Sequence, residues 1–143
     1  MQIGIPAETL AGETRVAVTP ETVKKLKALG HSLRIQSGAG VAASVTDDAY
    51  IAVGAEMTDA AGAFACDLVL KVRNTTDAEA KMLKSGATLV GMLNPFEADG
   101  IQRLASAGVT GFALEAAPRT TRGTSSTCTG SSASCARTTG RST

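Results

Sequence analysis

Near its N-terminus the chain reads Ile3-Gly4-Ile5-Pro6-Ala7-Glu8, and it continues through Gly12-Glu13-Thr14-Arg15 to Thr19-Pro20-Glu21. The apolar residues predict a short strand that ends in a proline turn. Thr19 and Pro20 predict the start of a helix, because threonine is a favoured N-cap and proline is tolerated in the first helical turn. Arg15 therefore lies between a strand end and a helix start, at the carboxyl edge of an α/β sheet, where such folds bind ligands.

Short apolar runs alternate with helical patterns from residue 2 to about residue 114, which is typical of βαβ units. Residues 67–72 form the clearest buried strand, since their apolar run is continuous, as in parallel strands covered on both faces. The other predicted strands span 2–5, 32–36, 88–92 and 109–114, with a brief one at 56–58, and the predicted helices span 20–29, 47–53, 59–64, 77–83 (with Asp77 as its cap) and 97–107. We predict an α/β fold with a doubly wound, mostly parallel sheet of the Rossmann or flavodoxin-like type.

The C-terminal 26 residues differ in composition from the rest. Residues 118–143 contain eight Thr, six Ser, four Arg and three Gly, and no Val, Ile, Leu, Met, Phe or Tyr. Such a segment cannot bury enough apolar surface to fold, so we predict a disordered tail. We therefore divide the chain into a domain at 1–117 and a Ser/Thr/Arg-rich tail at 118–143.

Charge and composition exclude several classes of function. Four of the fourteen basic residues lie in the tail, so the remaining ten face thirteen acidic residues and the domain itself is mildly acidic. This balance argues against a nucleic-acid partner. The three cysteines and the single histidine match no zinc-ligand spacing, so we expect no metal site. An odd cysteine count without a secretory signal indicates a reducing cytoplasm, and no apolar run reaches the ~20 residues of a membrane span.

Two cations are predicted at one edge of the sheet. Lys71 ends the buried strand, and Arg15 follows the first strand, so both lie where parallel strands end. Together they suggest a site for an anion such as a carboxylate or phosphate. The alternative for Lys71 is a stem that covers apolar surface while its ammonium reaches water. We interpret Glu13 as an ion-pair partner of Arg15 rather than as a general base, and no nucleophile–base–acid arrangement can be assembled around the single histidine.

A glycine-rich turn, Ser37-Gly38-Ala39-Gly40, follows the second predicted strand. With Val41-Ala42-Ala43 it fits the pattern that lets a dinucleotide pyrophosphate approach a helix N-terminus. However, the turn follows the second strand rather than the first, and Ser44-Val45-Thr46 does not continue as a firm helix. We therefore favour a structural turn over a nucleotide site.

Several short motifs in order resemble one known family. They are Ile3 to Glu21, Ser37-Gly38-Ala39-Gly40, Gly54-Ala55-Glu56, Leu70-Lys71-Val72, Leu89-Val90 and Pro118-Arg119-Thr120-Thr121-Arg122. Together they resemble the N-terminal region of the alpha subunit of the proton-translocating NAD(P) transhydrogenase, in the alanine dehydrogenase/transhydrogenase family. The resemblance covers about residues 1 to 122, and we expect that the chain is truncated or frameshifted beyond that point, with a natural Ser/Thr-rich linker as the alternative.

The resemblance implies the NAD(H)-binding component of an enzyme that transfers hydride between NADH and NADP and couples it to proton translocation. It implies that Arg122 contacts the nucleotide in a cleft shared with a second Rossmann domain. It further implies that Arg15 and Lys71 are remnant or orienting groups at this cleft and that no residue of this chain is catalytic. It also implies a homodimer and a membrane beta subunit, with a cytoplasmic location peripheral to the inner membrane.

The sequence departs from this family in two places. The loop after Arg122 reads Gly123-Thr124-Ser125-Ser126 and lacks the family's glutamine and aspartate, and the second Rossmann domain is absent. We therefore expect weak or no NAD(H) binding and no activity from this chain alone. In alanine dehydrogenases Arg15 and Lys71 would hold the substrate carboxylate, but the histidine of that enzyme is missing from Met92-Leu93-Asn94-Pro95. An amino-acid dehydrogenase fragment and a non-catalytic domain remain the alternatives.

Overall fold

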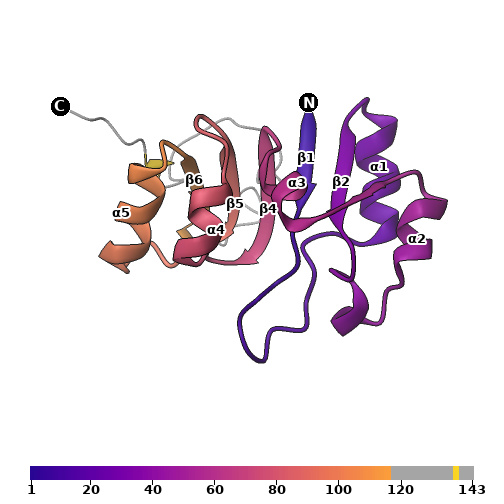
Figure 1. The fold of residues 1–143 in the computed structure, drawn as a ribbon, viewed down its shortest axis with the longest axis horizontal. Coiled ribbons are helices and arrows are strands. Elements are labelled where there is room, and N and C mark those ends of the chain that lie inside the picture. The colour runs from indigo at the N-terminus through magenta and orange to yellow at the C-terminus, as the bar shows by residue number, and fades with distance from the viewer. Residues whose placement is uncertain (117–136, 139–143) are drawn as a thin grey trace.

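The computed structural model describes residues 1–116 and 137–138, and these form one seven-stranded sheet (Figure 1). The strand order is β3-β2-β1-β4-β5-β6-β7. Strands β1 to β6 pair in parallel, and β7 pairs antiparallel to β6 through Phe112 and Arg137. The strands are β1 (Gln2–Ile5), β2 (Ser32–Gln36), β3 (Glu56–Thr58), β4 (Leu68–Arg73), β5 (Thr88–Met92), β6 (Thr110–Ala113) and β7 (Arg137–Thr138).

This arrangement confirms the predicted doubly wound α/β fold. The five principal strands and the brief strand at 56–58 all form, and the order from β3 through β1 and β4 to β6 is that of dinucleotide-binding Rossmann domains. The prediction of a disordered tail falls on residues 118–143, which lie outside the described residues apart from the two residues of β7.

The helices lie close to where the sequence predicts them. They are α1 (Pro20–Ala28), α2 (Asp47–Ala52), α3 (Ala60–Phe64), α4 (Asp77–Met82) and α5 (Ala98–Ser106), with short 3-10 turns at Val41–Ala43 and Leu114–Ala116. Thr19 caps α1 by accepting a hydrogen bond from the Thr22 N–H at 3.3 Å. Gly30 follows the helix with φ +87°, a conformation that favours glycine and ends the helix.

The cap of α4 differs from the prediction. Thr76, and not Asp77, is the N-cap, and Asp77 is the first helical residue. The Thr76 hydroxyl accepts from the Glu79 N–H at 3.4 Å, while Glu79 Oε2 accepts from the Thr76 N–H at 2.8 Å. This capping box satisfies two backbone donors, whereas Asp77 as a cap would satisfy one. The exchange matters because it fixes the position of the Glu79 carboxylate.

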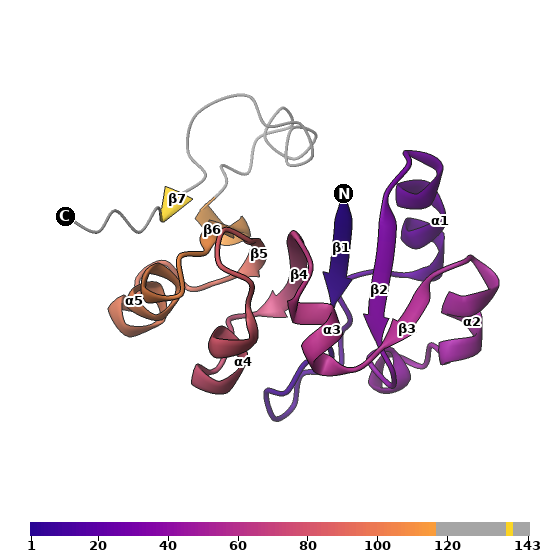
Figure 2. The same cartoon turned by 45° about the horizontal axis from the view of Figure 1, so that its top comes forward.

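The helices cover opposite faces of the sheet. On β1, Ile3 and Ile5 face a core that also contains Val23 of α1 and Tyr50 of α2. Gly4 points to the other face, where a Cβ would lie 1.8 Å from the Ala63 carbonyl oxygen of α3. A second core on that side contains residues of or beside α3, α4 and α5 together with Val69 and Leu89. Figure 2 shows α1 and α2 together near β2 and β3, and α4 and α5 near β5 and β6.

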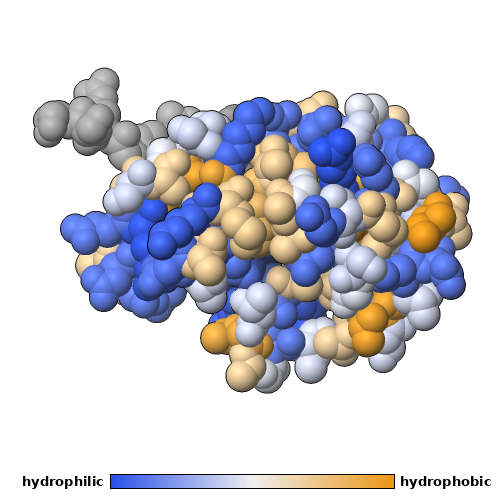
Figure 3. All heavy atoms as spheres, in the orientation of Figure 1, coloured by the Kyte–Doolittle hydropathy of each residue, from blue (hydrophilic) through white to orange (hydrophobic). Residues whose placement is uncertain are grey.

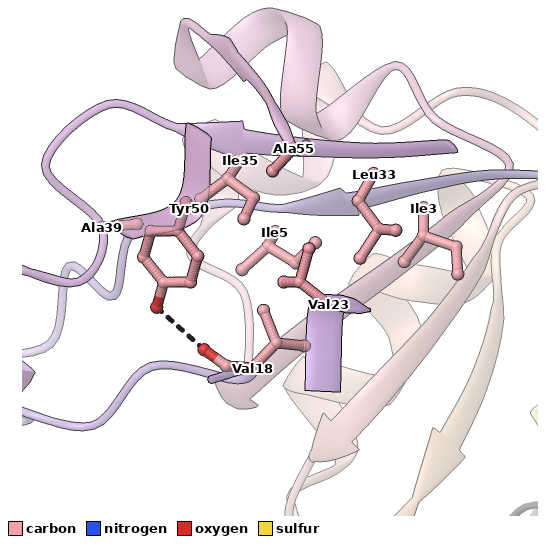
Figure 4. Packing of buried hydrophobic residues seen from close by; sticks show 9 residues of the cluster. All are labelled: Ile3, Ile5, Val18, Val23, Leu33, Ile35, Ala39, Tyr50 and Ala55. Atoms are coloured by element: carbon pink, nitrogen blue, oxygen red, sulfur yellow. Dashed lines mark hydrogen bonds between the residues drawn. The ribbon is translucent and has the colours of Figure 1, made fainter. Parts of the chain in front are cut away.

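Tyr50 is the central polar contact of the first core. Its side chain is fully buried, and its hydroxyl donates to the Val18 carbonyl at 2.8 Å (Figure 4). This bond ties α2 to the segment that leads into α1. At the surface, strongly hydrophobic residues are scattered singly over the face shown in Figure 3. Among the described residues, no helix is long and apolar enough to cross a membrane.

Candidate functional site

The strand order places the switch point of the sheet between the carboxyl ends of β1 and β4. The chain leaves β1 toward β2 and leaves β4 toward β5, so the connections diverge at this point, which is where open α/β sheets bind ligands. Strand β1 pairs with β4 only through Ile3–Leu68 and Gly4–Val69, and the register of β4 against β5 shifts between Leu70 and Arg73. The loop after β1 projects beyond this edge of the sheet (Figure 1). Both cations singled out in the sequence lie here.

Lys71 is buried inside this edge. Its side chain is 1% exposed, and its Nζ lies 2.9 Å from Glu79 Oε1 and 3.8 Å from Glu8 Oε2. The ammonium also lies 5.9 Å from the centre of the Phe64 ring. The alternative in which the ammonium reaches water is therefore wrong. Within the described residues, the two carboxylates occupy the position that an external anion would take beside Lys71.

Glu79 is held on three sides. Besides the bond from Lys71, it accepts from the Thr9 hydroxyl at 2.9 Å and from the Thr76 N–H. Burial by itself raises the pKa of this carboxyl, but the hydrogen bonds from Thr76, Lys71 and Thr9 outweigh burial and lower the pKa below its ordinary value. Glu79 therefore stays ionised at neutral pH and keeps the charge of Lys71 compensated.

Glu8 is the second acid of this group, and the sequence analysis missed it. Its carboxylate accepts from the backbone N–H of Val72 at 2.6 Å and from that of Arg73 at 3.3 Å, and its side chain is 4% exposed. These donors are 64 and 65 residues away along the chain. No local pattern around Pro6-Ala7-Glu8 indicates such a contact.

An outer group of charges surrounds Glu13. Arg15 donates to both carboxylate oxygens, each at 2.7 Å, and Arg73 Nε donates to Oε2 at 2.9 Å. The Arg15 guanidinium, its backbone N–H and the Arg73 guanidinium hold the pKa of Glu13 far below its usual range. The predicted pairing of Glu13 with Arg15 is confirmed. The carboxylate is 5% exposed, while Arg15 and Arg73 are 55% and 46% exposed.

The structure thus brings Arg15 and Lys71 to the same edge but gives each its own carboxylates. Arg73, rather than Lys71, shares an acid with Arg15. The sequence analysis did not single out Arg73, although its place two residues after Lys71 at the end of β4 is a usable signal. Arg122, the predicted nucleotide contact, lies outside the described residues.

The glycine-rich turn is structural, as the sequence favoured. The Gly38 N–H, which a phosphate would need, donates to both oxygens of Asp47 at 3.0 and 3.1 Å, and the Ser37 hydroxyl donates to the same carboxylate at 2.7 Å. A Cβ on Gly40 would lie 2.7 Å from the Val45 carbonyl oxygen. An acid therefore occupies the place of an anion, and the loop folds back on α2.

The turn after β5 is built by two long-range contacts. Asn94 has φ +47°, and its N–H donates to the Glu115 carboxylate. The Asn74 side chain donates to the Leu93 carbonyl at 2.9 Å. This turn contains Met92-Leu93-Asn94-Pro95, the stretch in which the resemblance places the histidine of alanine dehydrogenases.

The described residues do not fit a dinucleotide at the carboxyl edge between β1 and β4. A Rossmann site places a glycine turn and a helix N-terminus directly after β1. Here β1 ends at Ile5, Pro6-Ala7-Glu8 follows, and α1 begins only at Pro20. The Glu8 and Glu13 carboxylates would face the negative pyrophosphate.

Comparisons with known proteins agree with this architecture. The chain is 40% identical over 125 residues to the NAD(P) transhydrogenase subunit alpha of Cereibacter sphaeroides. This alignment covers 85% of this chain and 24% of that protein. It is 40% identical over 96 residues to the alanine dehydrogenase of Mycobacterium tuberculosis (strain CDC 1551 / Oshkosh), covering 66% of this chain and 26% of that enzyme. The chain thus spans about a quarter of the length of these curated relatives.

The crystal structure of a transhydrogenase from Sinorhizobium meliloti superimposes with a TM-score of 0.82 at 37% identity, over 85% of this chain and 37% of that one. The family model "Alanine dehydrogenase/PNT, N-terminal domain" matches residues 4–136. That match begins within β1 and takes in β2 to β6 and both groups of charges at the carboxyl edge of the sheet. The chain belongs to the alanine dehydrogenase/PNT N-terminal domain family.

Proposed function

We propose that this chain is part of the NAD(H)-binding component of a proton-translocating NAD(P) transhydrogenase, which transfers hydride between NADH and NADP and couples this transfer to proton translocation. The proposal is carried by the 40% identity over 125 residues to a transhydrogenase alpha subunit and by the TM-score of 0.82 against a transhydrogenase crystal structure. The β1–β4 switch point has the Rossmann strand order, and the chain's own carboxylates occupy its carboxyl edge. Such a domain supplies one wall of a nucleotide cleft and depends on a second domain for the pyrophosphate site. By itself the chain binds NAD(H) weakly or not at all and is inactive.

In this proposal residues 1–117 form the family domain and 118–143 a tail. Arg122 contacts the nucleotide in the assembled cleft. Arg15 and Lys71 are orienting groups rather than catalytic residues, because both already hold carboxylates of the chain. The nicotinamide rings carry the chemistry, and the protein contributes position and electrostatics.

The partners follow from the same proposal. The intact complex contains a homodimer of the alpha component and a membrane beta subunit, so this chain lies on the cytoplasmic side, peripheral to the inner membrane. Neither a nucleic acid nor a metal takes part.

The alternatives are an amino-acid dehydrogenase fragment and a non-catalytic domain. The first needs a free cationic pair for a substrate carboxylate, whereas Lys71 is bound by Glu79 and Glu8. The transhydrogenase relative also matches a larger share of this chain than the alanine dehydrogenase does, 85% against 66%.

Complementation tests these alternatives. The full chain is mixed with the remainder of a transhydrogenase alpha subunit, or with the remainder of an alanine dehydrogenase, each made as a separate polypeptide. We expect NAD(H) binding in a calorimeter only with the transhydrogenase remainder. Sub-micromolar NAD(H) binding by the chain alone would contradict the proposal. NADH formation from alanine and NAD with the second remainder would support the dehydrogenase, and no binding in either mixture would support the non-catalytic domain.

A further inference from the structure

The end of β4 presents two backbone donors to a carboxylate of the loop that follows β1. Strand β1 pairs with β4 only as far as Gly4–Val69, so the N–H groups of Val72 and Arg73 lie beyond the β1 pairing, while β5 still pairs with β4 at Arg73–Met92. Both donate to Glu8, to Oε1 at 2.6 Å and to Oε2 at 3.3 Å. One carboxylate thus contacts this end of β4 beyond the β1 pairing, with one oxygen on each amide.

The Lys71 ammonium completes this arrangement. Its Nζ lies 3.8 Å from Glu8 Oε2, on the oxygen that also accepts from Arg73. Two adjacent N–H groups and one buried cation form a cradle that suits a carboxylate in charge and in geometry. We call these three groups (the Val72 N–H, the Arg73 N–H and Lys71 Nζ) the β4 cradle.

Charge compensation alone does not account for Glu8. Lys71 already has a counter-ion in Glu79 at 2.9 Å, which is a shorter contact than the one to Glu8. The buried group therefore contains two carboxylates and one ammonium, and Glu8 is held mainly by the backbone amides. The Glu8 side chain is only 4% exposed and lies near a second acid, and burying such a carboxylate is costly unless hydrogen-bond donors point at its oxygens.

We propose that the β4 cradle is a carboxylate-binding site whose occupant is the chain's own Glu8 side chain. While Glu8 is in place, external anions do not reach Lys71. Removal of the Glu8 carboxylate opens the cradle to a small free carboxylate such as formate or acetate. This inference goes beyond the proposed function, because neither a nucleotide nor a second domain is involved.

Chemical rescue of Glu8→Ala in the full chain tests the inference. Thermal unfolding is followed in sodium formate, sodium acetate and sodium chloride at matched ionic strength. We expect the variant to unfold at a lower temperature than the native chain in chloride. Formate should then raise its Tm saturably, by about 3 °C or more over chloride, since a ligand bound only by the folded state stabilises it. The native chain should not distinguish formate from chloride.

Two variants serve as controls. Glu21→Ala removes an exposed glutamate whose partner is Lys25, at 3.0 Å on α1, so it should show no preference for formate. Glu8→Gln keeps a side chain in the cradle and should also be insensitive to formate. In a ¹⁵N spectrum of Glu8→Ala, formate should shift the amide signals of Val72 and Arg73 first.

Two results would overturn the inference. One is an equal response of Glu8→Ala and Glu21→Ala to formate, which would show a general salt effect. The other is a formate response without movement of the Val72 and Arg73 signals. If Glu8→Ala does not fold in chloride, recovery of its circular dichroism in formate is the same test, and failure to recover while Glu8→Gln folds normally counts against the site.

Discussion

The buried group at the end of β4 makes Lys71 the residue whose loss should cost most stability at this edge. The prediction concerns Lys71→Met, which keeps an unbranched side chain of similar length and removes the charge. Glu8 and Glu79, each at most 5% exposed, would then face each other without a cation between them. Removing one partner of a buried ion pair costs about 3–5 kcal/mol, because the remaining charge is left without compensation.

The magnitude can be checked against the distances. At 2.9 Å the attraction between Lys71 and Glu79 is about 6 kcal/mol gross for an effective dielectric constant of about 20. The desolvation of the pair offsets part of this attraction in the native chain, and partial protonation of Glu79 relieves part of the loss in the variant. A net loss of about 3 kcal/mol or more is therefore expected, out of a total stability on the order of 5–15 kcal/mol for a domain of this size.

Urea unfolding at neutral pH, followed by circular dichroism, measures this loss. The matched control is Lys25→Met, which removes an ion pair whose side chains are 74% and 78% exposed and should cost less than about 1 kcal/mol. The Lys71→Met deficit should shrink as the pH is lowered, because protonation neutralises the Glu79 carboxylate that Lys71 compensates in the native chain. A loss for Lys71→Met no larger than that for Lys25→Met, or a deficit that does not change with pH, would refute the reasoning.

Three further predictions follow from other contacts. Tyr50→Phe should cost about 1–2 kcal/mol in urea unfolding, because it leaves the Val18 carbonyl without its donor in the core; an unchanged midpoint would contradict this account. Gly4→Ala should lower Tm by several degrees or prevent folding, since its Cβ would lie 1.8 Å from the backbone oxygen of Ala63. In the control Gly86→Ala no atom lies within 4 Å of the new Cβ, so any loss of stability should come only from the positive φ at that position. Because the pKa of Glu79 is lower in the folded than in the unfolded state, its ionised carboxylate stabilises the fold above the unfolded pKa of about 4.3, and this stabilisation is lost as the pH falls through the folded pKa. Glu79→Gln should therefore have a smaller free energy of unfolding than the native chain at neutral pH and approach the native value in acid. Parallel pH profiles of stability for the two chains would argue against this role.

The carboxyl edge shows where sequence reasoning succeeds and where it stops. Arg15 and Lys71 could be placed together from the sequence, because parallel strands end at the same edge wherever they lie in the sheet. Their partners could not all be found in the same way. Glu13 is two residues from Arg15, so local spacing suggested that pair. Glu8 meets its donors across 64 and 65 residues, and nothing near it in sequence indicates them.

The same contrast applies to the caps. Thr19 and Asp59 cap helices as local rules predict, with their side chains accepting from Thr22 and Gly62. At α4 the choice between Thr76 and Asp77 depends on Glu79, which satisfies the cap while also holding Lys71. A rule that considers one residue at a time cannot weigh both demands on a single carboxylate.

The sequence by itself determined strands β1 to β6, helices α1 to α5 and the parallel arrangement of these strands, because hydrophobic periodicity, N-caps and glycine stops act over a few residues. It also determined that two cations would lie at one edge. Only the tertiary structure decided the strand order, the divergence of β1 from β4 and the occupation of that edge by Glu8, Glu13 and Glu79. These depend on which distant segments become neighbours, and on the cost of burying a charge without a partner, which no stretch of sequence specifies alone.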